Sequence, residues 1–344
     1  MRHCGLLVAL ASLVISCYAQ DHPEGPANEK AQKTYKEGLE YLQQHKTLAA
    51  LDSFKKADKQ DDGKCQECQR QMVKYGLELG DWKTAETAGE EMVAEAEGAR
   101  NIALAHYQLG FTLLNEGLER HKEELFQRAH DEMTKALAAA PNFPDAVFGD
   151  GRVLAHMNKD EEAKARFEQF VKMKPAGDPI RERAVRFISE PELARARMAP
   201  AFSIVTTEGQ RISIDELKGR VVLMDFWATW CGPCRAALPH IREIAKKFQG
   251  QPLVVLSINL DDDQQKWKAF IAKNEMTWPQ YGGDGGFKGP MATLFGVREI
   301  PQTFTIDADG ILQDQHIGDA SIEGKIKKLV SRARDLQAAE TAKQ

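Results

Sequence analysis

The chain has 344 residues, of which 42% are hydrophobic and 28% are charged, and its formal net charge is −5 at pH 7. A chain of this length is expected to form two or three domains, and the apolar content is sufficient for hydrophobic cores. The weak negative charge gives no support for a nucleic acid as partner, because such proteins carry basic surfaces.

The first 19 residues have the pattern of an export signal. Arg2 precedes an almost wholly apolar run from Leu6 to Ile15, and the segment ends with a small residue, Ala19. The run is short for a membrane span, so we expect residues 1–19 to be a signal peptide and the mature protein to be extracytoplasmic, as in a bacterial periplasm. The residues up to Cys17 also match a bacterial lipobox, so a soluble protein and a lipid anchor at Cys17 both stay open.

Residues 29–175 are predicted to form helical repeats, because helix-forming residues dominate and prolines are few. A pattern of small and large residues recurs there: Ala50, Phe54 and Ala57 return as Ala129, Met133 and Ala136 and as Ala163, Phe167 and Phe170, the last two sets 34 residues apart. Gly38 and Gly151 stand twelve residues before the first alanine of their sets, and Pro141 and Pro175 twelve residues after it.

This pattern resembles the tetratricopeptide repeat (TPR). The resemblance implies a TPR-like solenoid of antiparallel helix pairs, with small residues where two helices touch and a concave face that binds a protein or peptide. An ordinary helical bundle without repeat geometry is the alternative.

A C-x-x-C motif, Cys65 to Cys68, lies at the predicted start of a helix in this region. The sequence shows no buried acid, no proline between the cysteines and no preceding apolar strand. We therefore expect a structural disulfide, with a redox relay to Cys231 and Cys234 or a metal site as the alternatives.

Residues 176–198 are predicted to be a closing helix and a linker, since three prolines surround a basic segment from Ile180 to Ile188. We expect the arginines of this helix, Arg181, Arg183 and Arg186, to form its solvated face.

The stretch from Val221 to Pro239 carries the most specific chemical pattern. An apolar run ending at Trp227 predicts a buried strand, and Cys231-Gly232-Pro233-Cys234 then opens a segment with helical spacing of apolar residues. Cys231 is therefore expected at a helix N-terminus, where free N–H groups and the helix dipole stabilise a thiolate. Cysteines at this spacing can close and reopen a disulfide, which predicts thiol–disulfide exchange.

Two further residues strengthen this interpretation. Asp225 lies within the apolar strand, where burial raises the pKa of a carboxyl group, so that it can take the proton that Cys234 must lose. Ile300-Pro301 precedes a second predicted strand, and we expect a cis peptide bond there.

Residues 199–332 resemble the thioredoxin-like domain of extracytoplasmic thiol–disulfide oxidoreductases of the TlpA and ResA type, because Asp225 to Cys234 reads DFWATWCGPC, nearly the thioredoxin active-site string. The resemblance implies that Cys231 attacks and Cys234 resolves, with Asp225 as the buried acid and Pro301 beside the disulfide. Trp230, Gly232 and Pro233 complete the site string. Relatives of the ResA type often use an acid after the next strand instead, which makes Asp262 a second candidate.

The same resemblance implies disulfide-containing protein substrates, a membrane thiol electron donor and no metal or organic cofactor. A peroxidase of the peroxiredoxin kind is rejected, because its motif needs Pro seven and Thr or Ser three residues before the nucleophile, where Met224 and Ala228 stand. A TPR-based assembly scaffold with an accessory redox domain, and an oxidant or isomerase on the same fold, are the remaining alternatives.

The predicted architecture is multidomain, α followed by α/β. An all-helical repeat domain precedes a thioredoxin-like domain with a central mixed sheet flanked by helices. Residues 333–344 are expected to be a polar tail.

Overall fold

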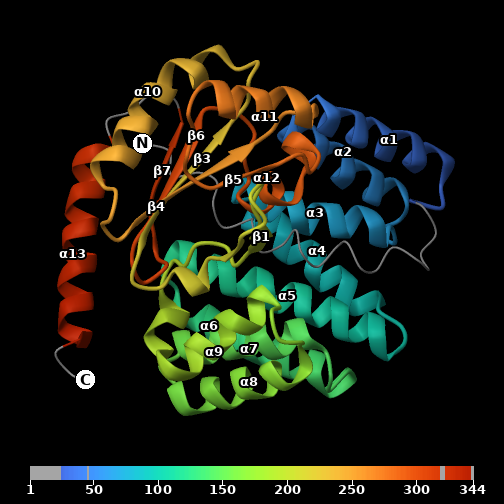
Figure 1. Cartoon of the computed structure of the whole chain (residues 1–344). Helices are drawn as coiled ribbons and strands as arrows, with labels where there is room; N and C mark the ends of the chain where they lie inside the picture. The colour runs from blue at the N-terminus through green and yellow to red at the C-terminus, as the bar shows by residue number, and fades with distance from the viewer. Residues whose placement is uncertain (1–24, 45, 318–321, 342–344) are drawn as a thin grey trace. The chain divides into compact units, whose positions relative to one another are not determined.

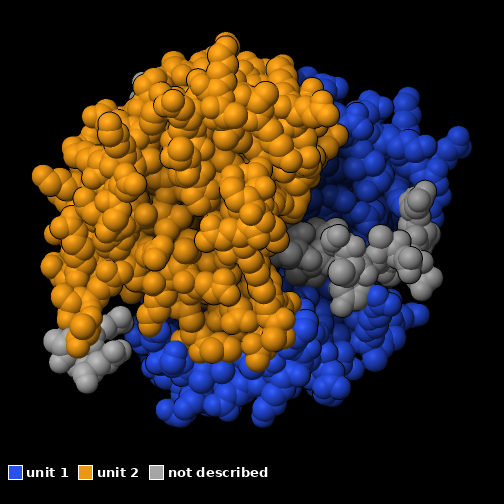
Figure 2. Space-filling model, viewed as in Figure 1, with its two compact units in different colours: residues 1–175, 187–195 blue, residues 176–186, 196–344 orange. Residues whose placement is uncertain are grey.

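The computed structural model describes residues 25–44, 46–317 and 322–341, so the predicted signal peptide and Cys17 lie outside the described residues. Figure 1 shows the course of the chain. It divides into two compact units, coloured separately in Figure 2. The helical unit comprises residues 1–175 and 187–195, and the α/β unit comprises residues 176–186 and 196–344.

The helical unit is built from successive helix pairs. In chain order the helices are α1 (Glu29–Gln43), α2 (Thr47–Gln60), α3 (Gln66–Leu79), α4 (Trp82–Glu95), α5 (Ala99–Arg120), α6 (Glu123–Ala139), α7 (Pro144–His156) and α8 (Asp160–Met173). Each of them packs mainly on its neighbours in the chain, the arrangement expected of stacked repeats.

Close helix contacts recur within these pairs. A Cβ atom added at Gly38 would lie 2.6 Å from a ring carbon of Phe54, and one added at Gly151 would lie 2.7 Å from the same ring carbon of Phe167. The small and large residues of the recurring sequence pattern are all buried. The pattern therefore identified where the paired helices touch.

Helix α9 (Pro179–Ser189) corrects one expectation. Arg183 and Arg186 do not form a solvated face, because both are buried and bind Asp215. Nε of Arg183 lies 2.8 Å and Nη1 of Arg186 lies 3.2 Å from Oδ1 of Asp215. Their partner belongs to the short 3-10 helix η3 (Asp215–Leu217), too far along the chain for a local charge pattern to indicate it.

The first strands of the α/β unit form a hairpin of β1 (Ser203–Val205) and β2 (Arg211–Ser213). Its mixed sheet has the strand order β5-β4-β3-β6-β7. The strands are β3 (Val221–Trp227), β4 (Leu253–Asn259), β5 (Gln280–Gly282), β6 (Gln302–Ile306) and β7 (Leu312–Ile317). Strands β3, β4 and β5 run parallel, and β6 and β7 are antiparallel to their neighbours.

Strand β3 lies at the centre of this sheet, and all seven of its residues are buried. In Figure 1, α10 (Gly232–Lys247) and α13 (Glu323–Thr341) lie on one face of the sheet, and α11 (Gln264–Lys273) and α12 (Pro290–Leu294) lie on the other. This is the predicted thioredoxin-like fold. It places the end of β3, directly before the C-x-x-C motif, at the carboxyl edge of the parallel strands.

The C-terminal part differs from the expectation of a polar tail after residue 332. Helix α13 continues to Thr341. Ala333 joins Ile326 and Val330 in one buried stripe, and the described side chains after Ala333 are exposed. None of the helices in the described ranges is long and apolar enough to cross a membrane.

We predict that Asp215→Asn destabilises the α/β unit by about 3–5 kcal/mol, because it leaves two buried guanidinium groups without their carboxylate. Guanidinium unfolding of the full chain, followed by tryptophan fluorescence, measures this. Glu216→Gln, on the exposed side of the same short helix, is the matched control and should leave the midpoint unchanged. Equal stability of both variants would show that the ion pairs do not hold α9 in place.

Candidate active site

The Cys231–Cys234 pair lies at the start of α10, directly after the loop that follows β3. The two cysteines form a disulfide, so this is the oxidised form. Cys231 is the N-cap of α10, and its Sγ accepts a hydrogen bond from the backbone N–H of Cys234 at 3.1 Å. Because the same N–H can bind a thiolate after reduction, the helix start stabilises the reactive form of Cys231.

Gly232 and Pro233 form the first turn of α10 and are exposed. Proline is compatible with this turn, since the first N–H groups of a helix need no helical partner. Each cysteine is only 5% exposed, whereas Trp230 beside them is 56% exposed. The ring of Trp230 lies near that of Phe287, with ring centroids 6.4 Å apart. An apolar surface therefore borders the disulfide.

The Ile300–Pro301 peptide bond is cis, as the sequence predicted. Antiparallel pairing of β3 with β6 places Gln302 opposite Phe226, which brings the preceding Pro301 to the end of β3. The carbonyl oxygen of Ile300 lies 3.8 Å from Sγ of Cys231. A backbone carbonyl therefore lies beside the sulfur of Cys231.

Asp225 is buried in the middle of β3, between Ser257 of β4 and Thr303 of β6. Burial raises the pKa of its carboxyl group to about 7, and a hydrogen bond from Ser257 Oγ at 3.4 Å opposes that shift. Ser257 in turn accepts a hydrogen bond from Nε1 of Trp278 at 2.8 Å. A carboxyl group with this pKa exchanges its proton near neutral pH, as a general acid–base requires.

The second candidate acid, Asp262, has an exposed side chain. Its neighbour Asp261 is buried instead and accepts hydrogen bonds from Thr229, two residues before Cys231. The sequence did not single out Asp261, because three aspartates follow β4 directly and nothing in their order shows which one turns inward. The structure therefore leaves Asp225 as the buried acid within the sheet.

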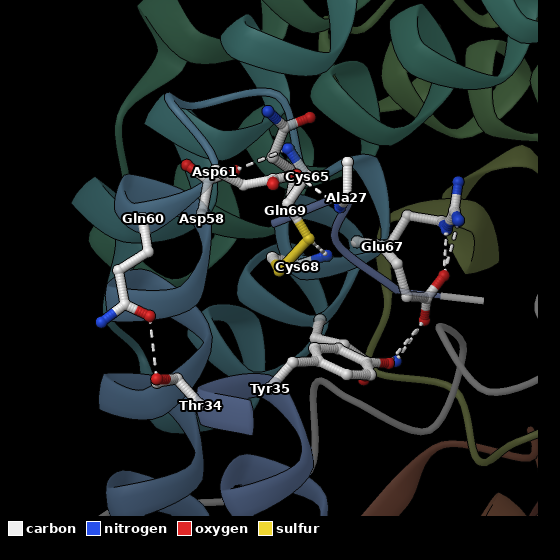
Figure 3. The surroundings of a disulfide bond; sticks show 12 residues. Ala27, Thr34, Tyr35, Asp58, Gln60, Asp61, Cys65, Glu67, Cys68 and Gln69 are labelled. Atoms are coloured by element: carbon white, nitrogen blue, oxygen red, sulfur yellow. Dashed lines mark hydrogen bonds and ion pairs between the residues drawn. A yellow bond between two sulfur atoms is a disulfide. The ribbon is translucent and has the colours of Figure 1, made fainter. Parts of the chain in front are cut away.

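The other C-x-x-C motif has a similar local geometry (Figure 3). Cys65 and Cys68 form a disulfide, Cys65 is the N-cap of α3, and its Sγ accepts the N–H of Cys68 at 3.1 Å. The backbone N–H of Cys65 donates to Oδ1 of Asp58 at 3.2 Å. The interpretation that no buried acid accompanies this motif is wrong, because Asp58 is buried and burial raises its pKa to about 6.

The surroundings of this second disulfide differ from those of the first. Cys65 and Cys68 are 2% and 0% exposed, and they pack with Ala57 of α2 and with Tyr35 of α1. Over the described ranges, no group of three His, Cys, Asp or Glu side chains is placed to hold a metal ion. The structure thus shows the pair as an enclosed disulfide.

Comparisons with known proteins identify relatives of the α/β unit. The AhpC/TSA family matches residues 196–315, within the α/β unit. Thiol-disulfide oxidoreductase ResA from Bacillus anthracis is 30% identical over 146 residues, which are 42% of this chain and 83% of that protein. Thioredoxin-like protein YneN from Bacillus subtilis (strain 168) is 29% identical over 140 residues, 40% of this chain and 79% of that protein.

Similar solved structures include StoA from Bacillus subtilis, 26% identical with a TM-score of 0.34, covering 38% of this chain and 97% of that one. A thiol-disulfide oxidoreductase from Bacteroides fragilis NCTC 9343 is 26% identical with a TM-score of 0.36, covering 38% of this chain and 98% of that one. Since the chain spans 83% of ResA at 30% identity, it belongs to the family of thiol-disulfide oxidoreductases that includes ResA.

Proposed function

We propose that this thiol–disulfide oxidoreductase reduces disulfides in protein substrates, with Cys231 as the attacking thiolate and Cys234 as the resolving thiol. The observation that carries this proposal is the position of Cys231, at the N-terminus of α10 and beside the cis Ile300–Pro301 bond. The exposed ring of Trp230 supports docking of a protein rather than a small thiol.

The reaction consists of two successive thiol–disulfide exchanges. The Cys231 thiolate attacks one sulfur of the substrate disulfide, which forms a mixed disulfide and releases the other substrate sulfur as a thiolate that takes a proton from water. Cys234 then gives its proton to the Asp225 carboxylate and attacks Sγ of Cys231. The second substrate thiolate leaves, two electrons have passed to the substrate, and the Cys231–Cys234 disulfide remains.

Each further turnover needs two electrons from a dithiol donor, which we propose to be a membrane thiol carrier. The chemistry uses only the sulfur atoms and carboxyl groups of the chain and requires no bound cofactor. Peroxidase activity is not proposed although the AhpC/TSA family matches, since Met224 and Ala228 occupy the positions where that motif needs Pro and Thr or Ser.

The helical unit is proposed to be a TPR-like array that binds a protein or peptide on its concave face. The recurring glycine-to-phenylalanine contacts in the α1–α2 and α7–α8 pairs support this proposal. The Cys65–Cys68 disulfide is proposed to be structural, because both cysteines are buried and pack with Ala57 and Tyr35. The pattern of residues 1–19 supports an extracytoplasmic location, either soluble or anchored through Cys17.

The first prediction concerns the order of attack. Cys234→Ser should accumulate a covalent mixed disulfide with a disulfide-containing protein such as insulin, because nothing resolves it, whereas Cys231→Ser should form none and lose all turnover. Non-reducing electrophoresis and mass spectrometry measure the adduct. If Cys231→Ser still reduces insulin, or if Cys234→Ser forms no adduct, the assigned roles are wrong.

A second prediction concerns the direction of electron flow. The reduction potential of the Cys231–Cys234 pair, measured in glutathione or dithiothreitol buffers, should lie near thioredoxin's value of about −270 mV. A value near about −120 mV would instead indicate an oxidant or isomerase. If the pair shows no reversible change between disulfide and dithiol, the reductase proposal fails. The alternative, an assembly scaffold with an accessory redox domain, then takes its place.

A third prediction follows from the pKa of Asp225, which is raised to about 7 in the folded protein. The folded state then binds a proton more tightly than the unfolded state, so this group's contribution to stability is present below about pH 4 and is lost as pH rises through 7. The free energy of unfolding of Asp225→Asn, relative to wild type, should therefore increase by about 4 kcal/mol between pH 4 and pH 8.

Urea unfolding of the oxidised proteins at both pH values measures this difference. At pH 7 the same variant should reduce insulin about 100-fold more slowly, since the proton of Cys234 loses its acceptor. Asp262→Asn is the control, and its exposed side chain should affect neither quantity. A pH-independent stability difference for Asp225→Asn would show that this carboxyl group is ionised normally.

A further inference from the structure

Asp261 is a buried carboxylate that the mechanism above does not use. It follows β4 and is 3% exposed. Both of its oxygens are engaged. Oδ2 accepts from the backbone N–H of Thr229 at 2.8 Å and from Nδ2 of Asn259 at 2.7 Å, and Oδ1 accepts from the hydroxyl of Thr229 at 2.6 Å.

These contacts join the loop after β3 to the loop after β4. The backbone N–H of Leu260 also donates to the carbonyl oxygen of Trp227 at 2.9 Å, and that of Asp261 donates to Oδ1 of Asn259 at 2.9 Å. Three donors converge on the one side chain, and an ionised carboxylate, which only accepts, can satisfy all of them. A side chain of other chemistry would leave buried donors without partners.

The loop that Asp261 holds leads directly into the reactive cysteine. Thr229 stands two residues before Cys231, and the backbone N–H of Cys231 donates to the carbonyl oxygen of Ala228 at 3.2 Å. That turn sets Cys231 in the N-cap position of α10, where its sulfur accepts the N–H of Cys234. A displacement of Thr229 therefore moves the sulfur away from the donor that stabilises its thiolate.

We propose that Asp261 is a positioning residue for the exchange reaction: through Thr229 it keeps the sulfur of Cys231 at the N-terminus of α10. The proposal rests on the assignment of Cys231 as the attacking thiolate. It deepens that assignment, because it makes the reactivity of Cys231 depend on a carboxylate from the loop after β4. Asp225 has a separate proposed role, which is to accept the proton of Cys234.

The direction in which the pKa of the Cys231 thiol changes when Asp261 is replaced separates this proposal from its alternatives. If Asp261 acted only as a negative charge near the sulfur, its removal would lower the pKa of the Cys231 thiol, because the thiolate would lose a repelling neighbour. If it holds the turn, its removal raises that pKa, because the thiolate loses its N–H donor. A purely structural role changes stability and leaves the pKa of the folded protein unchanged.

The test is the pH dependence of iodoacetamide alkylation of Cys231 in the reduced full-length protein, with the Cys231 peptide followed by mass spectrometry. For Asp261→Ala we expect the profile to move to higher pH by about one unit, which makes alkylation at pH 7 about tenfold slower. Asp261→Asn, which keeps the volume but loses an acceptor, should lie between this variant and wild type. Asp262→Asn should match wild type.

Two conservative changes at Thr229 keep the test decisive if Asp261→Ala does not fold. Thr229→Val loses only the hydroxyl donor, and it should shift the alkylation profile to higher pH by less than Asp261→Ala does. Thr229→Ser keeps the donor and should have the wild-type profile. An unchanged or lowered thiol pKa in folded Asp261→Ala, or in Thr229→Val, overturns the proposal. Failure of the reductase assignment would appear separately, as absence of the mixed disulfide in Cys234→Ser.

Discussion

The complete burial of β3 is the constraint on which the site depends. This strand pairs with β4 along its whole length and with β6 from Val222 to Phe226, and all seven of its residues are buried. Burial of the strand also buries Asp225, which raises the pKa of its carboxyl group to about 7. The same two pairings bring the Pro301 turn and the Asp261 loop to the end of the strand, where Cys231 begins α10. The groups to which we assign attack, proton acceptance and substrate docking therefore all lie on this packed strand or on the segments next to its end.

Much of this could be predicted from the sequence, because the informative residues are close together in the chain. The apolar run of β3, the C-x-x-C motif and the helical spacing after it lie within nineteen residues, from Val221 to Pro239. The cis bond before Pro301 followed from a proline at the start of a strand. In the helical unit, the spacing of Gly38 and Phe54 indicated a contact because paired helices repeat the same geometry. In each case the signal came from local motifs or from the spacing of residues along the chain.

The features that the sequence did not reveal are buried carboxylates whose partners are distant or whose orientation is set by tertiary packing. Asp215 pairs with Arg183 and Arg186 of α9, which by charge alone resembled a solvated face. Asp58 binds the N–H of Cys65 from the preceding helix, and Asp261 rather than Asp262 turns inward after β4. A carboxylate is buried only where the fold supplies donors for it. Composition and spacing do not show where those donors meet.

The two disulfides show what a C-x-x-C motif determines and what it leaves to its surroundings. Both motifs lie at the start of a helix, and in both the sulfur of the first cysteine accepts a hydrogen bond of 3.1 Å from the backbone N–H of the second. Each unit also has a buried aspartate, Asp58 or Asp225, whose pKa is raised. The helix start therefore favours a thiolate at Cys65 as it does at Cys231. Exchange with a protein also needs a surface beside the sulfur. Cys231 has the exposed Trp230 and the Ile300 carbonyl, whereas Tyr35 and Ala57 cover Cys65 and Cys68. The two pairs therefore share the motif and differ in their surroundings, which is the basis for proposing exchange at Cys231 and a structural role for Cys65 and Cys68.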